Sequence, residues 1–285
     1  MHAIVTDSTW SLSPALAEEF GITIVPLHVL GPEGEFLDSP AIERPEGRLT
    51  TSQPSQGELR EALEGAMDAG AGSAMCFHLS SELSGTAAAM EIVAAEVSAE
   101  RGVPIDVIDT RTTGAGLGFA ALVAARSLQA GESRRKAISR ARECASRARV
   151  LLTVDDPRHL QRGGRLAAPQ LAIGAALGIR PILELNHGVI GLREMARGAA
   201  KARAQLVKGA LTGVPPGSAS IAVHHVGDED SAHEVAEALR EAAEGAGIAV
   251  EHVAVTPLSL VLAAHTGPGA LGAVVAPTFG LLRDL

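Results

Sequence analysis

The stretch SAMCFHLSSELSGT, from Ser73 to Thr86, holds the pattern that decides the fold. Its first part, Ser73–His78, is a short apolar run that predicts a buried strand, and Ser84 opens a helical pattern that continues to Ser98. The polar turn between them places hydroxyls and free backbone N–H groups at the start of a helix, where an anion is favoured. This segment therefore predicts a strand-turn-helix unit that holds a phosphate or a carboxylate.

The same alternation of strand and helix patterns fills the first half of the chain. Ser13 and Pro14 form a typical helix start, with Ser at the N-cap and Pro at the first helical position. Strands are predicted over 3–6, 22–29 and 105–108, and helices over 14–19, 58–67, 116–130 and 133–148. Strands that alternate with helices predict β-α-β units, and thus a mostly parallel sheet with flanking helices.

The second half of the chain has a different pattern. Strands are predicted over 150–154, 179–185, 219–225 and 249–256, a hairpin-like return over 188–192, and helices over 194–210 and 229–246. Two segments rich in Gly, Pro and Ser, 31–57 and 212–218, are predicted as loops. The chain is therefore predicted to be an α/β protein of two domains, residues 1–150 and 151–285, with a mixed sheet in the second.

Composition excludes several classes of protein. Of 285 residues, 46% are hydrophobic and 20% charged, which is typical of a globular protein with a substantial core. Aromatic residues make up only 2%, so a surface on which bases stack is disfavoured. The formal net charge of −9 repels phosphate backbones, and no nucleic-acid partner is expected.

Cysteines, leader patterns and apolar runs point to a cytoplasmic protein. Cys76 and Cys144 are isolated residues without metal-ligand spacing, which fits a reducing compartment. The segment after Met1 lacks the pattern of a signal peptide, and runs such as 117–125 are too short to span a bilayer. We expect a monomer with no metal and no cofactor.

Several familiar binding-site motifs are incomplete in this sequence. The glycines of the segment 114–118 follow a strand and open a helix, but the acidic residue that a dinucleotide site needs about 20 positions later is missing. Close packing of the helix on the sheet is the better interpretation. Four histidines lack ligand spacing and are interpreted as core or surface residues: His224, His225, His233 and His252.

Five polar segments stand out as candidate site loops. They are Thr6–Thr9 (TDST), Thr50–Ser55 (TTSQPS), Ser80–Thr86 (SSELSGT), Gly163–Arg165 (GGR) and His265–Ala270 (HTGPGA). Taken singly, residues such as Asp7, Ser8 and Ser52 have a simpler interpretation as turn formers or helix caps. Five such segments in one chain favour a shared site.

With their flanking residues, these segments resemble the DegV family in order and over nearly the whole chain. Further matches are Gly21-Ile22 to Val25-Pro26-Leu27, Val107-Ile108-Asp109-Thr110 and Ile179-Arg180-Pro181-Ile182-Leu183. Two departures occur. Ala87–Ala89 stand where the family usually has an aromatic residue and Gln, and Arg180 stands where it often has Lys.

The resemblance implies a lipid-binding protein rather than an enzyme. A long-chain fatty acid would lie in a tunnel between or beside the two domains, with its carboxylate held by hydroxyls. FakB-like members present that carboxylate to a partner fatty-acid kinase for acyl-phosphate formation, a step in phospholipid metabolism. Carried over by motif, Thr51 or its neighbour Ser52 would bind the carboxylate with Ser84 and the backbone of Gly85. Arg165 and His265 would lie close to it and contact the kinase or the phosphoryl group.

An alternative keeps the same residues but assigns turnover to the chain itself. In this hypothesis Ser84 is the nucleophile and His265 the base of an acyl hydrolase or phosphotransferase. A G-x-S-x-G elbow is missing from the sequence, and no third residue is evident that would orient the histidine.

The energetics of burial agree with lipid binding. Burying each methylene gives ~0.8 kcal/mol, so burying a tail of about sixteen carbons gives on the order of 10 kcal/mol before association costs.

Overall fold

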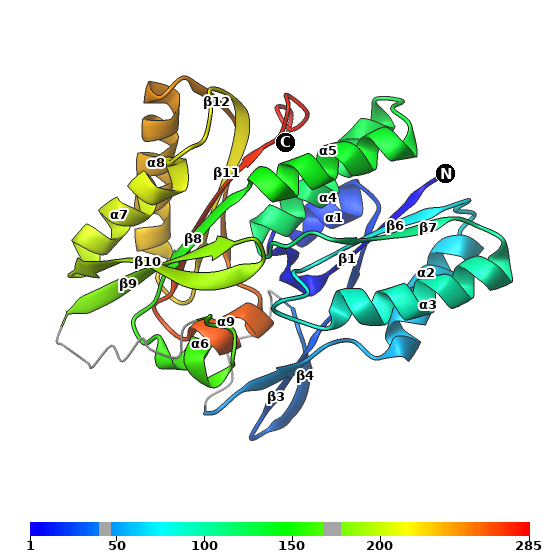
Figure 1. The fold of residues 1–285 in the computed structure, drawn as a ribbon, viewed down its shortest axis with the longest axis horizontal. Helices are drawn as coiled ribbons and strands as arrows, with labels where there is room; N and C mark the ends of the chain where they lie inside the picture. Colours follow the sequence, from blue (N-terminus) through cyan, green and yellow to red (C-terminus); the bar gives the residue numbers. More distant parts are fainter. Residues whose placement is uncertain (40–46, 168–177) are drawn as a thin grey trace.

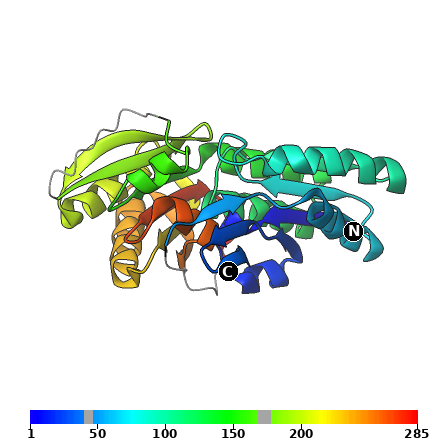
Figure 2. The ribbon, with the colours of Figure 1, turned by 90° about the horizontal axis from the view of Figure 1, so that it is seen from below.

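Two larger β-sheets and a small three-stranded one organise the chain in a computed structural model that describes residues 1–39, 47–167 and 178–285. Figure 1 shows the two larger sheets side by side, with helices α4 (Ala115–Gln129) and α5 (Arg134–Arg147) between and above them. The hairpin of β3 (His28–Gly31) and β4 (Gly34–Leu37) projects below. Figure 2 shows the same elements from below.

The first sheet is parallel throughout and has the order β2-β1-β6-β7. Its strands are β1 (Ala3–Asp7), β2 (Ile22–Val25), β6 (Ala74–His78) and β7 (Ile105–Asp109). Helices α2 (Gln56–Asp68) and α3 (Thr86–Arg101) cover one face, and α1 (Pro14–Glu19), α4 (Ala115–Gln129) and α5 (Arg134–Arg147) lie on the other. Because side chains alternate along a strand, Val5 packs towards the first group of helices and Ile4 towards the second.

The second sheet is mixed and has the order β10-β9-β8-β13-β11-β12, in which only β11 and β12 are parallel neighbours. Its strands are β8 (Arg149–Thr153), β9 (Ile179–Asn186), β10 (Val189–Arg197), β11 (Gly217–His225), β12 (Ile248–Pro257) and β13 (Leu271–Pro277). Helices α7 (Ala199–Leu211) and α8 (Glu229–Gly245) pack on one face. These two sheets confirm the predicted α/β class, while the predicted domain boundary at residue 150 stays a prediction.

Helix α4 is the central packing element, buried along almost its whole length. Its glycines allow this close approach, because a Cβ at Gly118 would lie 2.7 Å from both Leu12 Cδ1 and the Trp10 carbonyl oxygen. A Cβ at Gly116 would collide with the Thr112 hydroxyl. The structure thus supports the packing interpretation of these glycines over a dinucleotide fingerprint.

Three sequence predictions of local structure are wrong. The single strand predicted over 22–29 is two strands, since β2 ends at Val25, before Pro26, and β3 (His28–Gly31) joins another sheet. The segment 31–57, predicted as a loop, contributes β4 (Gly34–Leu37) and β5 (Thr50–Ser52) to that small sheet. The helix predicted from Glu194 begins only at Ala199, because β10 continues to Arg197 as the partner of β9.

Other elements were not predicted at all. They are β13, α6 (Arg158–Arg162) and α9 (Leu260–Thr266). Strand β13 lies between β8 and β11, and three of its seven residues are Gly or Ala, which are weak strand formers. Pairing with both neighbours extends the strand beyond Val274 and Val275, its two β-branched residues. In the described ranges, no helix combines the length and apolar character needed to cross a membrane.

Candidate functional site

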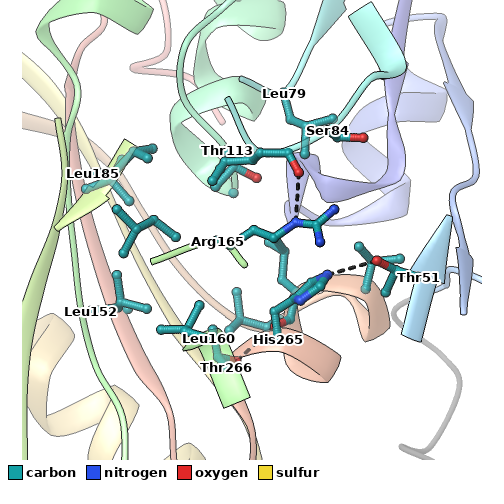
Figure 3. A pocket seen from close by; sticks show the side chains of 18 of the residues that line it. Thr51, Leu79, Ser84, Thr113, Leu152, Leu160, Arg165, Leu185, His265 and Thr266 are labelled. Carbon is teal, nitrogen blue, oxygen red and sulfur yellow. Dashed lines mark hydrogen bonds between the residues drawn. The ribbon is translucent and has the colours of Figure 1, made fainter. Parts of the chain in front are cut away.

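An apolar cavity of about 370 Å³ opens between elements of both halves of the chain. Its volume is in the usual range of small-molecule sites. Its apolar wall contains Leu27, Leu79, Leu83, Val150, Leu152, Leu160, Leu185, Ile190, Val261 and Val274. No Phe or Trp is among the described residues that line it. Figure 3 shows Leu152 and Leu185 on one side and the polar residues Thr51 and His265 on the other.

All six site residues predicted from the sequence line this cavity: Thr51, Ser52, Ser84, Gly85, Arg165 and His265. They come from four separate segments, namely β5, the turn before α3, the turn after α6, and α9. The fold therefore brings the predicted set together at one place. The role of each residue in ligand binding stays a prediction.

Thr51 and His265 form a hydrogen-bonded pair across the cavity wall. The distance between Thr51 Oγ1 and His265 Nε2 is 2.8 Å, although the residues are 214 positions apart. Burial, and secondly the positive charge of Arg165, lower the pKa of His265 to about 4. The imidazole is therefore neutral at pH 7 and offers a hydrogen bond rather than a charge.

Arg165 supplies the positive charge of the site. Its Nε donates to the Leu83 carbonyl oxygen at 3.0 Å, and its Nη1 donates to the Gly163 carbonyl oxygen. No carboxylate among the described residues pairs with it. Because its described partners are main-chain oxygens, the guanidinium charge is available to an anion that enters the cavity.

Ser84 and Gly85 mark the start of α3. Ser84 Oγ lies 2.9 Å from Thr86 Oγ1, and Gly85 occupies the N-cap without any side-chain cap. The first N–H groups of this helix therefore lack the side-chain acceptor that usually satisfies them. A Cβ at Gly85 would collide with the Gln53 amide, so glycine lets Gln53 reach this helix end. The arrangement offers hydroxyl and backbone donors to an anion.

The segment Thr6–Thr9 positions the site rather than lining it. Asp7 Oδ1 accepts from Thr9, and Asp7 Oδ2 accepts from the backbone N–H of Leu79 at 2.9 Å, which fixes the turn that leads to Ser84. Ser8 Oγ donates to Asp38 at 2.7 Å. Asp38 in turn accepts from the N–H of Val261 in α9 at 3.0 Å. These buried bonds tie β1, β6 and α9 to each other.

The glycines of two other motifs permit α6 and α9 to approach closely. A Cβ at Gly163 would lie 2.5 Å from His265 Nδ1. A Cβ at Gly267 would lie 2.7 Å from the His159 ring, and Gly267 has a φ of +78°, which favours glycine. The GGR and HTGPGA segments thus form one packed unit that holds Arg165 and His265 together.

Sequence reasoning missed four polar residues of the cavity wall: Gln53, Thr113, His224 and Thr266. Gln53 and Thr266 lie inside the TTSQPS and HTGPGA motifs, so the motifs themselves were the signal that could have identified these two residues. His224 was interpreted as a core or surface histidine, and it is buried at 2% exposure. Nothing in the sequence near Thr113 or His224 marks them as parts of a cavity.

A second cavity of about 360 Å³ adjoins the first. Thr51, Arg165 and His265 line both, so they form the partition between the two. The other side chains around it include Arg48, His159 and Arg162, and no carboxylate is among its described lining residues. This second cavity therefore has a basic wall, in contrast to the aliphatic wall of the first.

Comparison with known sequences finds one family over the whole chain. A family model described as an uncharacterised protein of the DegV family matches residues 1–278. A DegV domain-containing protein of Streptomyces coelicolor is 38% identical over 284 residues, covering 96% of this chain and 97% of that protein.

Comparison with solved structures gives the same result. A DegV family protein from Thermus thermophilus, described by its fatty acid binding, superposes with a TM-score of 0.85 at 29% identity, over 97% of this chain and 99% of that one. DegV from Bacillus subtilis, described as a fatty acid binding protein, gives a TM-score of 0.78 at 29% identity, over 96% and 98% of the two chains.

Proposed function

Because the chain belongs to the DegV family, we propose that it binds a long-chain fatty acid and presents the carboxylate to a partner kinase. The observation that carries the proposal is the cavity itself, an aliphatic chamber with its donors gathered at the Thr51–His265 pair, Ser84 and Arg165. Relatives described as fatty-acid-binding support the ligand class.

The aliphatic wall supplies affinity for the tail. Each buried methylene contributes ~0.8 kcal/mol, so a tail of about sixteen carbons gains on the order of 10 kcal/mol before the cost of association. An alkyl chain is flexible and needs no ring stacking. A wall of Leu, Ile and Val side chains without Phe or Trp in its described part suits it.

The polar end must offset the loss of water from the carboxylate. An ionised carboxylate moved out of water is strongly destabilised unless donors replace its hydration. Ser84 Oγ, the backbone N–H groups at the start of α3 and the Arg165 guanidinium are such donors. Thr51 adds its hydroxyl, with His265 as its hydrogen-bonding neighbour. We assign the direct contact to Thr51 rather than Ser52, because the Thr51 hydroxyl already meets His265 at the partition.

The second cavity suits the phosphoryl group in this proposal. A phosphate that approaches the carboxylate from the side of Arg48 and Arg162 would meet positive charge on its way to the partition of Thr51, Arg165 and His265. The ATP-binding and catalytic groups would belong to the kinase, and this chain would hold and orient the acceptor oxygen.

The contacts do not favour the alternative of a stand-alone hydrolase or phosphotransferase. In the described part of the chain, the Ser84 hydroxyl is paired with Thr86, and His265 Nε2 is paired with Thr51 rather than with Ser84. A serine nucleophile needs a base within hydrogen-bond reach. Turnover without a partner is the observation that would favour this alternative.

The binding proposal is tested by identifying the lipid that the protein carries. Freshly purified protein is denatured, extracted and measured by mass spectrometry, and we expect close to one long-chain fatty acid per chain. Leu152→Trp places an indole in the cavity, where it occupies the space that the tail needs. The amount of bound acid should fall below about a tenth of the wild-type amount, while the circular dichroism spectrum stays unchanged.

A surface substitution serves as the matched control. Ile92 lies on α3 at 52% exposure, away from the cavity, and Ile92→Trp should keep the full amount of lipid. The proposal is contradicted if the folded wild-type protein carries no fatty acid and also takes up none when palmitate or oleate is added.

A further inference from the structure

A buried hydroxyl in the wall of the aliphatic cavity has no hydrogen-bond partner among the described residues. Thr113 lines the cavity and is 8% exposed, and its Oγ1 has no hydrogen-bond partner within the described part of the chain. Figure 3 shows Thr113 near Leu79, with Arg165 between it and the Thr51–His265 pair. A buried hydroxyl without a partner costs free energy, so a ligand atom that accepts its proton would be favoured there.

His224, which lines the same cavity, offers no partner to the Thr113 hydroxyl. His224 is fully engaged, since its Nε2 accepts from the N–H of Ala115 at 3.1 Å and its Nδ1 lies 2.9 Å from Thr256 Oγ1. Thr256 donates its own proton to the Ser11 carbonyl oxygen, so it accepts from His224 Nδ1. Burial lowers the pKa of His224 to about 4, which keeps this neutral arrangement at pH 7.

The position of Thr113 in the chain favours an acceptor on the ligand. Thr113 directly precedes Gly114, the N-cap of α4, and this cap has no side-chain hydrogen bond. The start of a buried 15-residue helix carries a partial positive charge. The N–H of Ala115 at this helix end already donates to His224 Nε2, so the Thr113 hydroxyl is the donor that a ligand oxygen would use, and the helix end favours that oxygen through its partial charge.

We propose that Thr113 hydrogen-bonds an oxygen carried on the acyl chain, so that the cavity selects oxygenated long-chain acids, hydroxy or keto acids, over the plain acids. This inference rests on the proposed fatty-acid binding and goes beyond it by naming the ligand class. Thr113 is a specificity-determining residue in this proposal, separate from the donors that hold the carboxylate.

The test compares matched ligands on the delipidated full-length protein. Octadecanoic acid and its derivatives with a hydroxyl or keto oxygen at carbon 10 or carbon 12 are titrated by calorimetry. We expect the wild-type protein to bind at least one oxygenated acid about five- to tenfold more tightly than the plain acid, as one neutral hydrogen bond allows. Thr113→Val, which keeps the shape and removes the hydroxyl, should bring this ratio to about one.

Two further variants make the result specific. Thr112 also has a buried hydroxyl without a partner in the described chain, but it is not part of the cavity wall, so Thr112→Val should keep the wild-type ratio. Thr113→Ser keeps the hydroxyl and should keep the preference as well. If Thr113→Val does not fold, the wild-type protein itself decides the matter, since it must prefer an oxygenated acid over the plain acid.

Several outcomes would overturn the inference. One is a wild-type protein that binds every oxygenated acid no better than the plain acid. Another is a Thr113→Val variant that weakens plain and oxygenated acids equally, which would place Thr113 at the carboxylate instead. If the wild-type protein binds none of the acids, the proposed function itself fails, and this result is distinct from the loss of a preference.

Discussion

In the proposed function, the hydroxyls of Ser84 and Thr51 have different roles. The Ser84 hydroxyl stands at the start of α3 beside Thr86, whereas the Thr51 hydroxyl meets His265 at the partition between the two cavities. A long tail in the aliphatic cavity supplies most of the affinity in the proposed function. Each head-group donor then contributes little to binding and more to the orientation of the carboxylate.

Ser84→Ala is therefore expected to affect presentation more than affinity. Loss of one hydrogen bond should weaken fatty-acid binding about two- to tenfold. Acyl-phosphate formation with a fatty-acid kinase and ATP should fall about a hundredfold, because a misplaced acceptor oxygen costs far more in the reaction than in binding. Calorimetry measures the first quantity, and trapping the acyl phosphate with hydroxylamine measures the second.

Ser81→Ala is the matched control for this change. The Ser81 hydroxyl donates to Asp109 at 2.6 Å and is not part of either cavity adjoining the partition, so both quantities should stay at wild-type values. An equal loss of binding and of phosphorylation in Ser84→Ala would count against its assigned role in orientation.

The sequence predicts the residues of the polar end better than the rest of the cavity. Short polar motifs at the ends of strands or helices contain Thr51, Ser84, Arg165 and His265. Such motifs can be recognised from the amino-acid sequence alone. Thr113 has no such mark, because the lack of a partner for its hydroxyl depends on neighbours that come from other parts of the chain. A free buried hydroxyl is a property of the packed structure alone.

At the scale of elements, α4 shows how small residues fix the distance between layers. It packs against both larger sheets and against the segment around Leu12. Its glycines have no free space around them, whereas Gly65 in α2 has no atom within 4 Å of where a Cβ would lie. The same residue type is therefore required by packing in one helix and merely tolerated in the other.

Gly118→Ala and Gly65→Ala should change stability in opposite directions. The new methyl at position 118 would lie 2.7 Å from the Trp10 carbonyl oxygen, so the free energy of unfolding should fall by about 1–3 kcal/mol. At position 65 the alanine meets no neighbour and favours the helix, so stability should rise by up to about 1 kcal/mol. Urea denaturation followed by circular dichroism measures both. A Gly118→Ala protein as stable as the wild type would contradict the packing argument.

The elements that the sequence predicts well are those with strong local signals. Helix α1 begins at Pro14 after the Ser13 cap and ends at Glu19, as the pattern indicates. The errors lie where tertiary pairing overrides local preference. Strand β10 continues through Glu194 to Arg197 because β9 offers a partner over that length, although the residues themselves favour a helix.

At the scale of the whole molecule, the cavity joins the two halves of the chain. Leu79 and Leu83 belong to the first half, and Leu152, Leu185 and Val274 to the second, and all of them line the same chamber. One continuous hydrophobic core also includes residues of both halves. A ligand in this chamber contacts both halves at once, so its binding energy is expected to stabilise them together.

Saturation with fatty acid should therefore protect both sides of the cavity. At a free acid concentration one hundred times the Kd, the free energy of unfolding should rise by about 2.7 kcal/mol. For a chain of 285 residues, that corresponds to an increase in Tm of roughly 4–5 °C. Hydrogen exchange read by mass spectrometry should slow both in the segment 79–86 and in α9, while the solvent-facing side of α8 serves as the internal reference.

The methyl ester of the same acid is the control for the carboxylate. It keeps the tail and lacks the charge, so it should protect α9 less than the acid does. Protection confined to one half of the chain would show that the acid does not occupy the chamber between them.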